Sequence, residues 1–171
     1  MNKAVFFDRD GVINERIKGG YVRNWDEFVL SPDLGNVLQQ VRAKGYLAVI
    51  ITNQRGVGRE IMTEKDLLKL HEQLQAHLST AFGVKFDDIY YSTDLSNDSP
   101  RRKPSPAMLL EAAEKWDIDL ASSWMVGDST SDIIAGKQAG TKTVYLVTKH
   151  TDEVPADTIV IGSLSELLEL L

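Results

Sequence analysis

Runs of apolar residues alternate with amphipathic segments along most of this chain. Residues 46–51 form one continuous apolar run, as is typical of a parallel strand that is buried on both faces. Shorter runs predict further strands at residues 3–8, 88–92, 124–126, 143–147 and, at an edge, 158–161. Because helical segments separate most of these runs, the pattern favours an open parallel sheet with helices on both faces.

Local signals mark where the helices are expected to begin. Ser31-Pro32 and Ser105-Pro106 each combine an N-cap residue with a proline at the first helical position, and predict helices that end near residues 44 and 116. Thr63 and Asp66 resemble a capping box for a helix that ends at residues 82–83.

The C-terminal third of the chain predicts two more helices. One ends near Gly140, and Ser163 with Glu166 is the expected capping box of the last. Residues 9–30 have no sustained period and are predicted to be a flap over the site described below. With 171 residues and no internal repeat, we expect one α/β domain over residues 1–171.

Composition narrows the classes of function. The hydrophobic content is 43% and the charged content 26%, and no apolar run reaches the ~20 residues that span a bilayer. We expect a cytoplasmic location, because the N-terminus lacks the pattern of a signal peptide. We also expect a monomer without a membrane partner. The net charge of −6 argues against a nucleic-acid partner, and the absence of cysteine excludes thiolate chemistry.

The first predicted strand ends in two acidic residues. In an extended segment Asp8 and Asp10 lie on one face and Arg9 on the other, while Gly11 lets the backbone turn away. Like charges held so close raise each other's pKa unless a cation lies between them, which predicts a shared proton or a bound metal ion. An ordinary strand followed by an Asp-Gly turn is the plainer interpretation of this stretch alone.

Polar residues also end the other strands or follow them closely. Thr52 closes the run at residues 46–51, Lys103 lies in the loop after residues 88–92, and Asp128 follows residues 124–126. The carboxyl ends of parallel strands meet at one edge of the sheet, where ligands bind. Each residue alone could serve as a cap or a solvated charge, but their joint occurrence favours a common site.

These residue types suit phosphoryl transfer. Asp8 or Asp10 can attack phosphorus, and the other can donate a proton and then activate water. Asp128 and Asp132 can complete an oxygen-ligand site for Mg²⁺. A hydroxyl from Thr52 and the charge of a lysine would stabilise the transferred group.

The four motifs resemble those of the haloacid dehalogenase superfamily of aspartate-nucleophile phosphatases. They lie at residues 8–14, 52–54, 102–106 and 126–132 and occur in the family's order. The resemblance implies a Rossmann-like fold without a large cap domain. It also implies that Asp8 is the nucleophile, that Asp10 is the acid and base, and that Mg²⁺ is held by Asp8, the Asp10 carbonyl and Asp128. Asp132 would support the ligands from outside the coordination sphere.

Within the superfamily, the motifs are most similar to the branch that hydrolyses heptose bisphosphates and histidinol phosphate. The preferred expectation is removal of the C7 phosphate of D-glycero-D-manno-heptose 1,7-bisphosphate through an aspartyl phosphate. A second phosphate requires a second cationic site, for which guanidinium groups are suited. The residues implied for the substrate and its phosphates are Thr52, Asn53, Arg59, Arg102 and Lys103.

The chain departs from this branch in two places. Residues 92–101 contain neither the cysteines nor the histidine of a zinc loop, so no structural zinc is expected. Val12 stands where threonine is more usual.

Three alternatives remain from the sequence. Histidinol phosphate is the nearest alternative substrate, and a polynucleotide 3′-phosphatase would share the motifs but is disfavoured by the net charge of −6. A phospho-accepting receiver module, from a different class, would carry its aspartate after the third strand, where this chain has Ser92 and Thr93.

Overall fold

The computed structural model describes residues 1–171 and contains one sheet of six strands. The strands are β1 (Lys3–Phe7), β2 (Tyr46–Asn53), β3 (Asp88–Ser92), β4 (Trp124–Gly127), β5 (Lys142–Leu146) and β6 (Ile159–Ile161). Their order in space is β3-β2-β1-β4-β5-β6, and every neighbouring pair is parallel. The predicted open parallel sheet is therefore confirmed.

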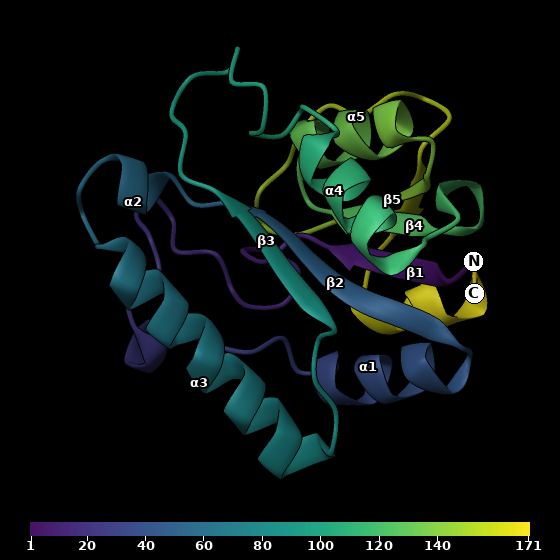
Figure 1. Ribbon diagram of the computed structural model, residues 1–171, viewed down its shortest axis with the longest axis horizontal. Helices are drawn as coiled ribbons and strands as arrows, with labels where there is room; N and C mark the ends of the chain where they lie inside the picture. The colour runs from purple at the N-terminus through teal and green to yellow at the C-terminus, as the bar shows by residue number, and fades with distance from the viewer.

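Helices cover both faces of this sheet (Figure 1). On one face lie α1 (Leu34–Ala43), α3 (Glu64–Phe82) and the 3₁₀ helix η3 (Leu164–Glu169). On the other lie α4 (Ala107–Trp116) and α5 (Thr130–Ala139). The short elements are η1 (Trp25–Glu27), α2 (Arg55–Gly58) and η2 (Leu120–Ser122). No helix combines the length and the apolar character that crossing a bilayer requires.

Two hydrophobic clusters fill the space between the sheet and its helices. The cluster under α1 and α3 has 24 buried residues, and the cluster under α4 and α5 has 11. Leu70, Leu74 and Leu78 form the buried stripe of α3 at helical spacing. Each buried leucine contributes about 1.5–3 kcal/mol relative to an exposed one, so packing holds this helix in place more than intrinsic propensity does.

The strand order places a crevice beside β1. From β1 the chain passes to β2 and β3 on one side, and it then returns to β4 on the other side of β1. At such a switch point the loops after the two strands diverge, which opens a space outside their carboxyl ends. Asp8 directly follows β1 and Asp128 directly follows β4, so both lie at this opening.

Most predicted boundaries agree with the structure, and the capping box of Thr63 and Asp66 is confirmed. The predicted N-cap at Ser31 is wrong: α1 begins at Leu34, and the Ser31 hydroxyl instead donates to the carbonyl of Val12 at 2.6 Å. Val12 itself is fully buried in the larger cluster, which explains why an apolar residue fits there.

The predicted start of α4 is also displaced. Pro106 is the N-cap residue, while the hydroxyl of Ser105 donates to the Pro100 carbonyl at 2.6 Å and thereby closes the preceding loop. A carbonyl from a distant part of the chain holds the Ser31 hydroxyl, whereas the Ser105 hydroxyl also accepts from the Ala107 N–H at 3.2 Å and still binds the first turn of α4.

The last predicted helix is a 3₁₀ helix, and the predicted capping box of Ser163 and Glu166 is wrong. The Glu166 carboxylate accepts from the Gly162 N–H at 2.7 Å, one residue before the expected donor. The prediction also missed α2, a single turn between β2 and α3 whose four residues are too few to show a period.

Candidate active site

Lys103 connects two acidic residues beneath the carboxyl edge of the sheet. Its ammonium group donates to Asp8 Oδ1 at 2.8 Å, to Asp132 Oδ1 at 2.6 Å and to the Ile51 carbonyl at 2.7 Å. Three acceptors satisfy all three of its N–H groups. The lysine side chain is only 2% exposed, so its charge is fixed in position and compensated.

The Asn53 side chain holds the backbone of that lysine. Its Oδ1 accepts from the Lys103 N–H at 3.0 Å, and its Nδ2 donates to the Lys103 carbonyl at 3.0 Å. Residues that are 50 positions apart in sequence are joined by this reciprocal pair. The end of β2 therefore sets the position of the lysine.

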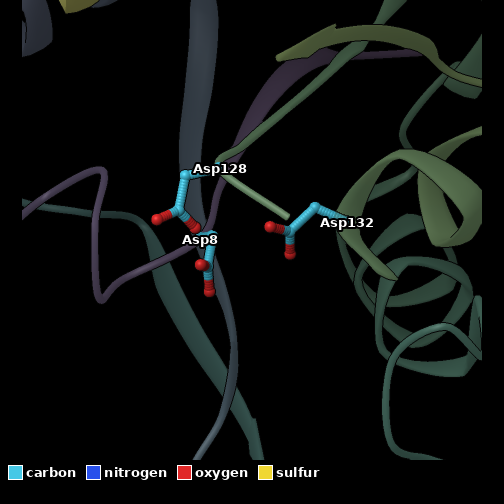
Figure 2. Close-up of side chains that lie close together, drawn as sticks. All are labelled: Asp8, Asp128 and Asp132. Atoms are coloured by element: carbon cyan, nitrogen blue, oxygen red, sulfur yellow. The ribbon is translucent and has the colours of Figure 1, made fainter. Parts of the chain in front are cut away.

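Three carboxylates lie close together at this edge of the sheet (Figure 2). Asp8, Asp128 and Asp132 each place an oxygen within 4.8 Å of the others. Asp128 Oδ2 is buried and has no hydrogen-bond partner, and the Asp10 carbonyl accepts no hydrogen bond. Gly11 has a φ of +94°, and a Cβ at this position would lie 1.9 Å from Asp128 Oδ2. These unpartnered oxygens and the space beside them fit Mg²⁺, which prefers oxygen ligands.

Burial dominates the electrostatics of this cluster. It raises the pKa of Asp8 well above its ordinary value, and the negative charges of Asp132 and Asp128 add to the effect while Lys103 opposes it. The pKa of Asp128 is raised by burial as well. Burial works against the charge of Lys103, but Asp132 and Asp8 outweigh it and raise the pKa of the lysine. A divalent cation would favour the ionised carboxylates.

Asp10 has a different environment from Asp8. Its Oδ1 accepts from Arg9 Nη2 at 2.9 Å and from Asn14 Nδ2 at 3.0 Å, and its Oδ2 accepts from Gln54 Nε2 at 3.0 Å. Burial opposes ionisation, but the charge of Arg9 and these hydrogen bonds lower the pKa of Asp10. The group is thus held as a carboxylate in a fixed orientation, which is the form that can accept a proton.

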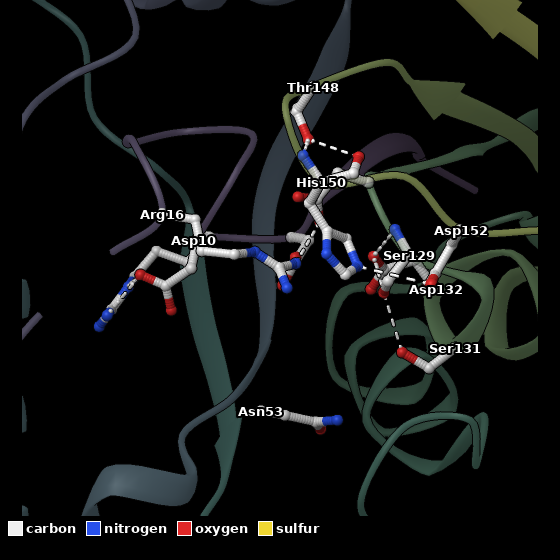
Figure 3. A network of polar contacts seen from close by, with 12 residues as sticks. Asp10, Arg16, Asn53, Ser129, Ser131, Asp132, Thr148, His150 and Asp152 are labelled. Atoms are coloured by element: carbon white, nitrogen blue, oxygen red, sulfur yellow. Dashed lines mark hydrogen bonds and ion pairs between the residues drawn. The ribbon is translucent and has the colours of Figure 1, made fainter. Parts of the chain in front are cut away.

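Asp8, Asp10, Lys103 and Asp132 line a cavity of about 1140 Å³, large enough for a phosphorylated sugar. Asp128 is fully buried and does not line it. The polar network of the cavity includes Asp10 and Arg16 on one side and Ser129 and His150 on the other (Figure 3). Arg16, in the segment between β1 and α1, donates to Asp128 Oδ1 at 2.7 Å. This segment forms one wall of the cavity, as predicted for residues 9–30.

Three arginines also line this cavity, and we call this group the arginine end: Arg55, Arg59 and Arg102. None of them forms an ion pair. The Nε atoms of Arg55 and Arg102 are buried without a partner. Burial, with the charges of Arg55 and Arg59, lowers the pKa of Arg102. Arg102 Nη1 donates to the Leu95 carbonyl at 2.7 Å, which fixes the guanidinium without neutralising it. Cations without a carboxylate partner are suited to bind an anion.

Comparisons with known proteins agree with this geometry. Residues 15–140 match the model of a hydrolase family described as haloacid dehalogenase-like hydrolase. A relative from Helicobacter pylori, D-glycero-beta-D-manno-heptose-1,7-bisphosphate 7-phosphatase, is 36% identical over 98% of this chain and 96% of its own. The relative of the same name from Pasteurella multocida is 41% identical over 86% of this chain and 82% of its own.

The chain belongs to the haloacid dehalogenase-like hydrolase family. A solved structure of D,D-heptose 1,7-bisphosphate phosphatase from B. bronchiseptica, complexed with magnesium and phosphate, superposes with a TM-score of 0.89. It is 28% identical, and the match covers 98% of this chain and 97% of that one. The family membership that the four sequence motifs predicted is therefore confirmed. The assignment to the phosphoric monoester hydrolases is confirmed as well.

The structure brings together most of the site residues expected for this family. Asp8, Asp10, Asn53, Arg102 and Lys103 all line the cavity. Thr52 does not: its side chain is fully buried, and its hydroxyl accepts from Gln54 Nε2 at 2.9 Å. Its contact with a phosphate stays a prediction.

Asp132 and Arg59 complete the expected set. Both carboxylate oxygens of Asp132 already have partners, Lys103 on one and Ser129 on the other, which agrees with a supporting position. Arg59 is exposed at the rim, with its guanidinium 6.0 Å from the ring centroid of Tyr21.

Sequence reasoning missed Arg16 and Arg55. Arg16 lies in a segment without a period, so nothing local shows that it reaches Asp128, whose position is 112 residues away. Arg55 follows the motif at residues 52–54 directly, and its charge at that place was a usable signal.

Proposed function

We propose that the protein is a Mg²⁺-dependent phosphatase that removes the C7 phosphate of D-glycero-D-manno-heptose 1,7-bisphosphate. The observation that carries this proposal is the cavity with two charged ends. One end has the carboxylates and Lys103, and the other has three unpaired arginines. A bisphosphate has one anion for each end, and the names of the relatives support the heptose as its sugar.

We assign the first chemical step to Asp8. A carboxylate oxygen of Asp8 attacks the phosphorus atom, and the bond from phosphorus to the sugar oxygen breaks as the aspartyl phosphate forms. Asp10 gives its proton to the leaving sugar oxygen. The proton must arrive with the substrate or the solvent, because the hydrogen bonds around Asp10 favour its carboxylate in the free protein.

Water completes the cycle. The Asp10 carboxylate takes a proton from a water molecule, and the resulting oxygen attacks the phosphoaspartate, which releases phosphate and restores Asp8. Lys103 lies 2.8 Å from Asp8 Oδ1 and would neutralise charge on the phosphoryl oxygens. When bound by Asp8, the Asp10 carbonyl and Asp128, Mg²⁺ would supply further charge for the transferred group.

The arginine end would bind the phosphate that is not cleaved. Arg55, Arg59 and Arg102 have no carboxylate partner, and guanidinium groups bind phosphate through paired hydrogen bonds. Their positions would select for a second phosphate at a distance from the carboxylates. A monophosphate would use only one end of the cavity.

Turnover on a panel of substrates tests the proposal. The panel holds both anomers of the heptose 1,7-bisphosphate, fructose 1,6-bisphosphate, histidinol phosphate and p-nitrophenyl phosphate, each assayed with Mg²⁺ by release of inorganic phosphate. We expect the highest kcat/KM for a heptose bisphosphate, with the phosphate released from C7. A higher kcat/KM for histidinol phosphate would replace the heptose in this proposal.

A further inference from the structure

Arg9 buries a positive charge immediately beside the two acids that line the cavity. Its side chain is 0% exposed, and it does not line the cavity although Asp8 and Asp10 do. A buried charge is costly unless partners compensate it. Residues packed around Arg9 inside the protein must therefore supply those partners.

The partners come from three directions. The guanidinium donates to Asp10 Oδ1 through Nε at 3.3 Å and through Nη2 at 2.9 Å. Its Nη1 lies 3.3 Å from His71 Nε2. The ring of Phe28 lies with its centroid 5.6 Å from the guanidinium carbon. Arg9 is thus held between Asp10 and a histidine that is 62 residues away on α3.

His71 is suited to accept a hydrogen bond from a cation. It is 4% exposed, and burial together with the charge of Arg9 lowers its pKa to about 3. The ring is therefore neutral at pH 7. Because the guanidinium can only donate, Nε2 is the unprotonated nitrogen.

We propose that His71 is a positioning residue that fixes the guanidinium of Arg9 and, through it, the carboxylate of Asp10. The argument is geometric: Arg9 and Asn14 hold Oδ1 of Asp10, and Gln54 holds Oδ2. Proton transfer needs the carboxyl group within hydrogen-bond reach of the leaving oxygen, so a small rotation of Asp10 reduces the rate. This inference rests on the proposed function.

A purely structural role for His71 makes a different prediction. If the histidine only satisfied a buried donor, its loss would lower stability and affect all substrates alike. If the histidine positions Asp10, the reduction in rate on replacing it will depend on the leaving group of the substrate. A sugar alkoxide needs a proton from Asp10, whereas p-nitrophenolate leaves without one.

The test replaces His71 with apolar residues. For His71→Leu and His71→Phe we expect kcat/KM on the heptose bisphosphate to fall on the order of 10-fold. We compare kcat/KM because it reports the steps up to departure of the leaving group, whereas hydrolysis of the phosphoaspartate is common to all substrates. On p-nitrophenyl phosphate we expect a fall of less than about 3-fold, because the leaving group is good. His71→Gln, which keeps an acceptor, should recover most of the rate.

The matched control is His77→Leu, an exposed histidine on the same helix, which should keep wild-type kinetics. Circular dichroism and urea unfolding show which variants fold. Equal losses on both substrates, no loss on either, or failure of both apolar variants to fold would overturn the inference. Absence of wild-type turnover on the bisphosphate would instead overturn the proposed function.

Discussion

The two ends of the cavity differ in how their charges are compensated. At the carboxylate end, Asp8, Asp10 and Lys103 line the cavity, and Asp128 is buried close to Asp8. Each of these charged groups has a partner of opposite sign within 3 Å. At the arginine end, none of the three guanidinium groups has such a partner. The charges of the first end are compensated within the protein, whereas those of the second lack a carboxylate partner and are left for an anionic ligand.

This difference follows from where the residues lie. Asp8 and Asp128 directly follow strands that are buried in the centre of the sheet, so the backbone that carries them is rigid. Arg55 and Arg59 are on and beside the single turn α2, and Arg102 is in the loop before α4. Groups that react need fixed positions, whereas groups that select a substrate can lie on loops.

The largest effect is expected at the nucleophile. Asp8→Asn should reduce kcat roughly 10³-fold or more on every substrate, because an amide of the same shape cannot attack phosphorus. Rapid quench with acid should trap phosphate on wild-type Asp8 and none on the variant. Asp26→Asn changes the same charge at an exposed position and serves as the control. Wild-type turnover without a trapped phosphoenzyme would contradict this role. Asp10→Asn should also be severely impaired.

The second effect concerns the metal. EDTA should abolish activity without unfolding the protein, and Mg²⁺ should restore it. Gly11→Ala should lower activity about 100-fold, since its Cβ would lie 1.9 Å from Asp128 Oδ2. Thermal shift with increasing Mg²⁺ measures binding directly and should show a loss of affinity.

Gly140→Ala is the matched control for that glycine. Its φ of +93° imposes the same backbone strain, but no atom lies within 4 Å of its Cβ position. It should lose about 1 kcal/mol of stability and keep its response to Mg²⁺. If both variants lost that response equally, strain rather than the contact with Asp128 would be the cause.

The third prediction separates the two ends. Arg102→Ala should lower kcat/KM for the heptose bisphosphate by roughly 10- to 100-fold, the equivalent of about 1.5–3 kcal/mol for one charge-assisted contact. Turnover of p-nitrophenyl phosphate should change little, because that substrate does not reach the arginine end. Arg23→Ala removes an arginine that is paired with Glu27 on the surface, and controls for net charge. Equal losses on both substrates would place Arg102 at the reacting phosphate.

The smallest effect is expected at Arg59. Its side chain is exposed, so solvent and salt screen its charge, and Arg59→Ala should lower kcat/KM for the bisphosphate only roughly 2- to 5-fold. The difference from wild type should shrink as the salt concentration rises. A loss as large as that of Arg102→Ala would show that both arginines contact the distal phosphate.

The sequence predicted the carboxylate end better than the arginine end. Asp8, Lys103 and Asp128 were recognisable because each ends a buried strand or follows one in a motif. Arg102 was found through its place beside Lys103. Arg55 was not found although it directly follows the motif at residues 52–54, because α2 is too short to show a helical period that would place its side chain.

The helix boundaries show the same limit. Thr63 and Asp66 are close in sequence, and their capping box formed as expected. Ser31 also had a local cap signal, yet its hydroxyl bonds the carbonyl of Val12, which is 19 residues away. A local signal holds only where no distant group competes for the same atom.

The sequence alone determined the order of strands and helices, the parallel sheet and the edge at which the acidic residues meet. These follow from periodicity and from the rule that parallel strands end on the same side, and both are properties of short segments. The tertiary structure decided which atoms are free. It left Asp128 Oδ2 without a partner, brought Arg16 to the same carboxylate and set His71 against Arg9. Those contacts join residues 62 or more positions apart, and the packing of whole elements, not the local pattern, sets the direction of their side chains.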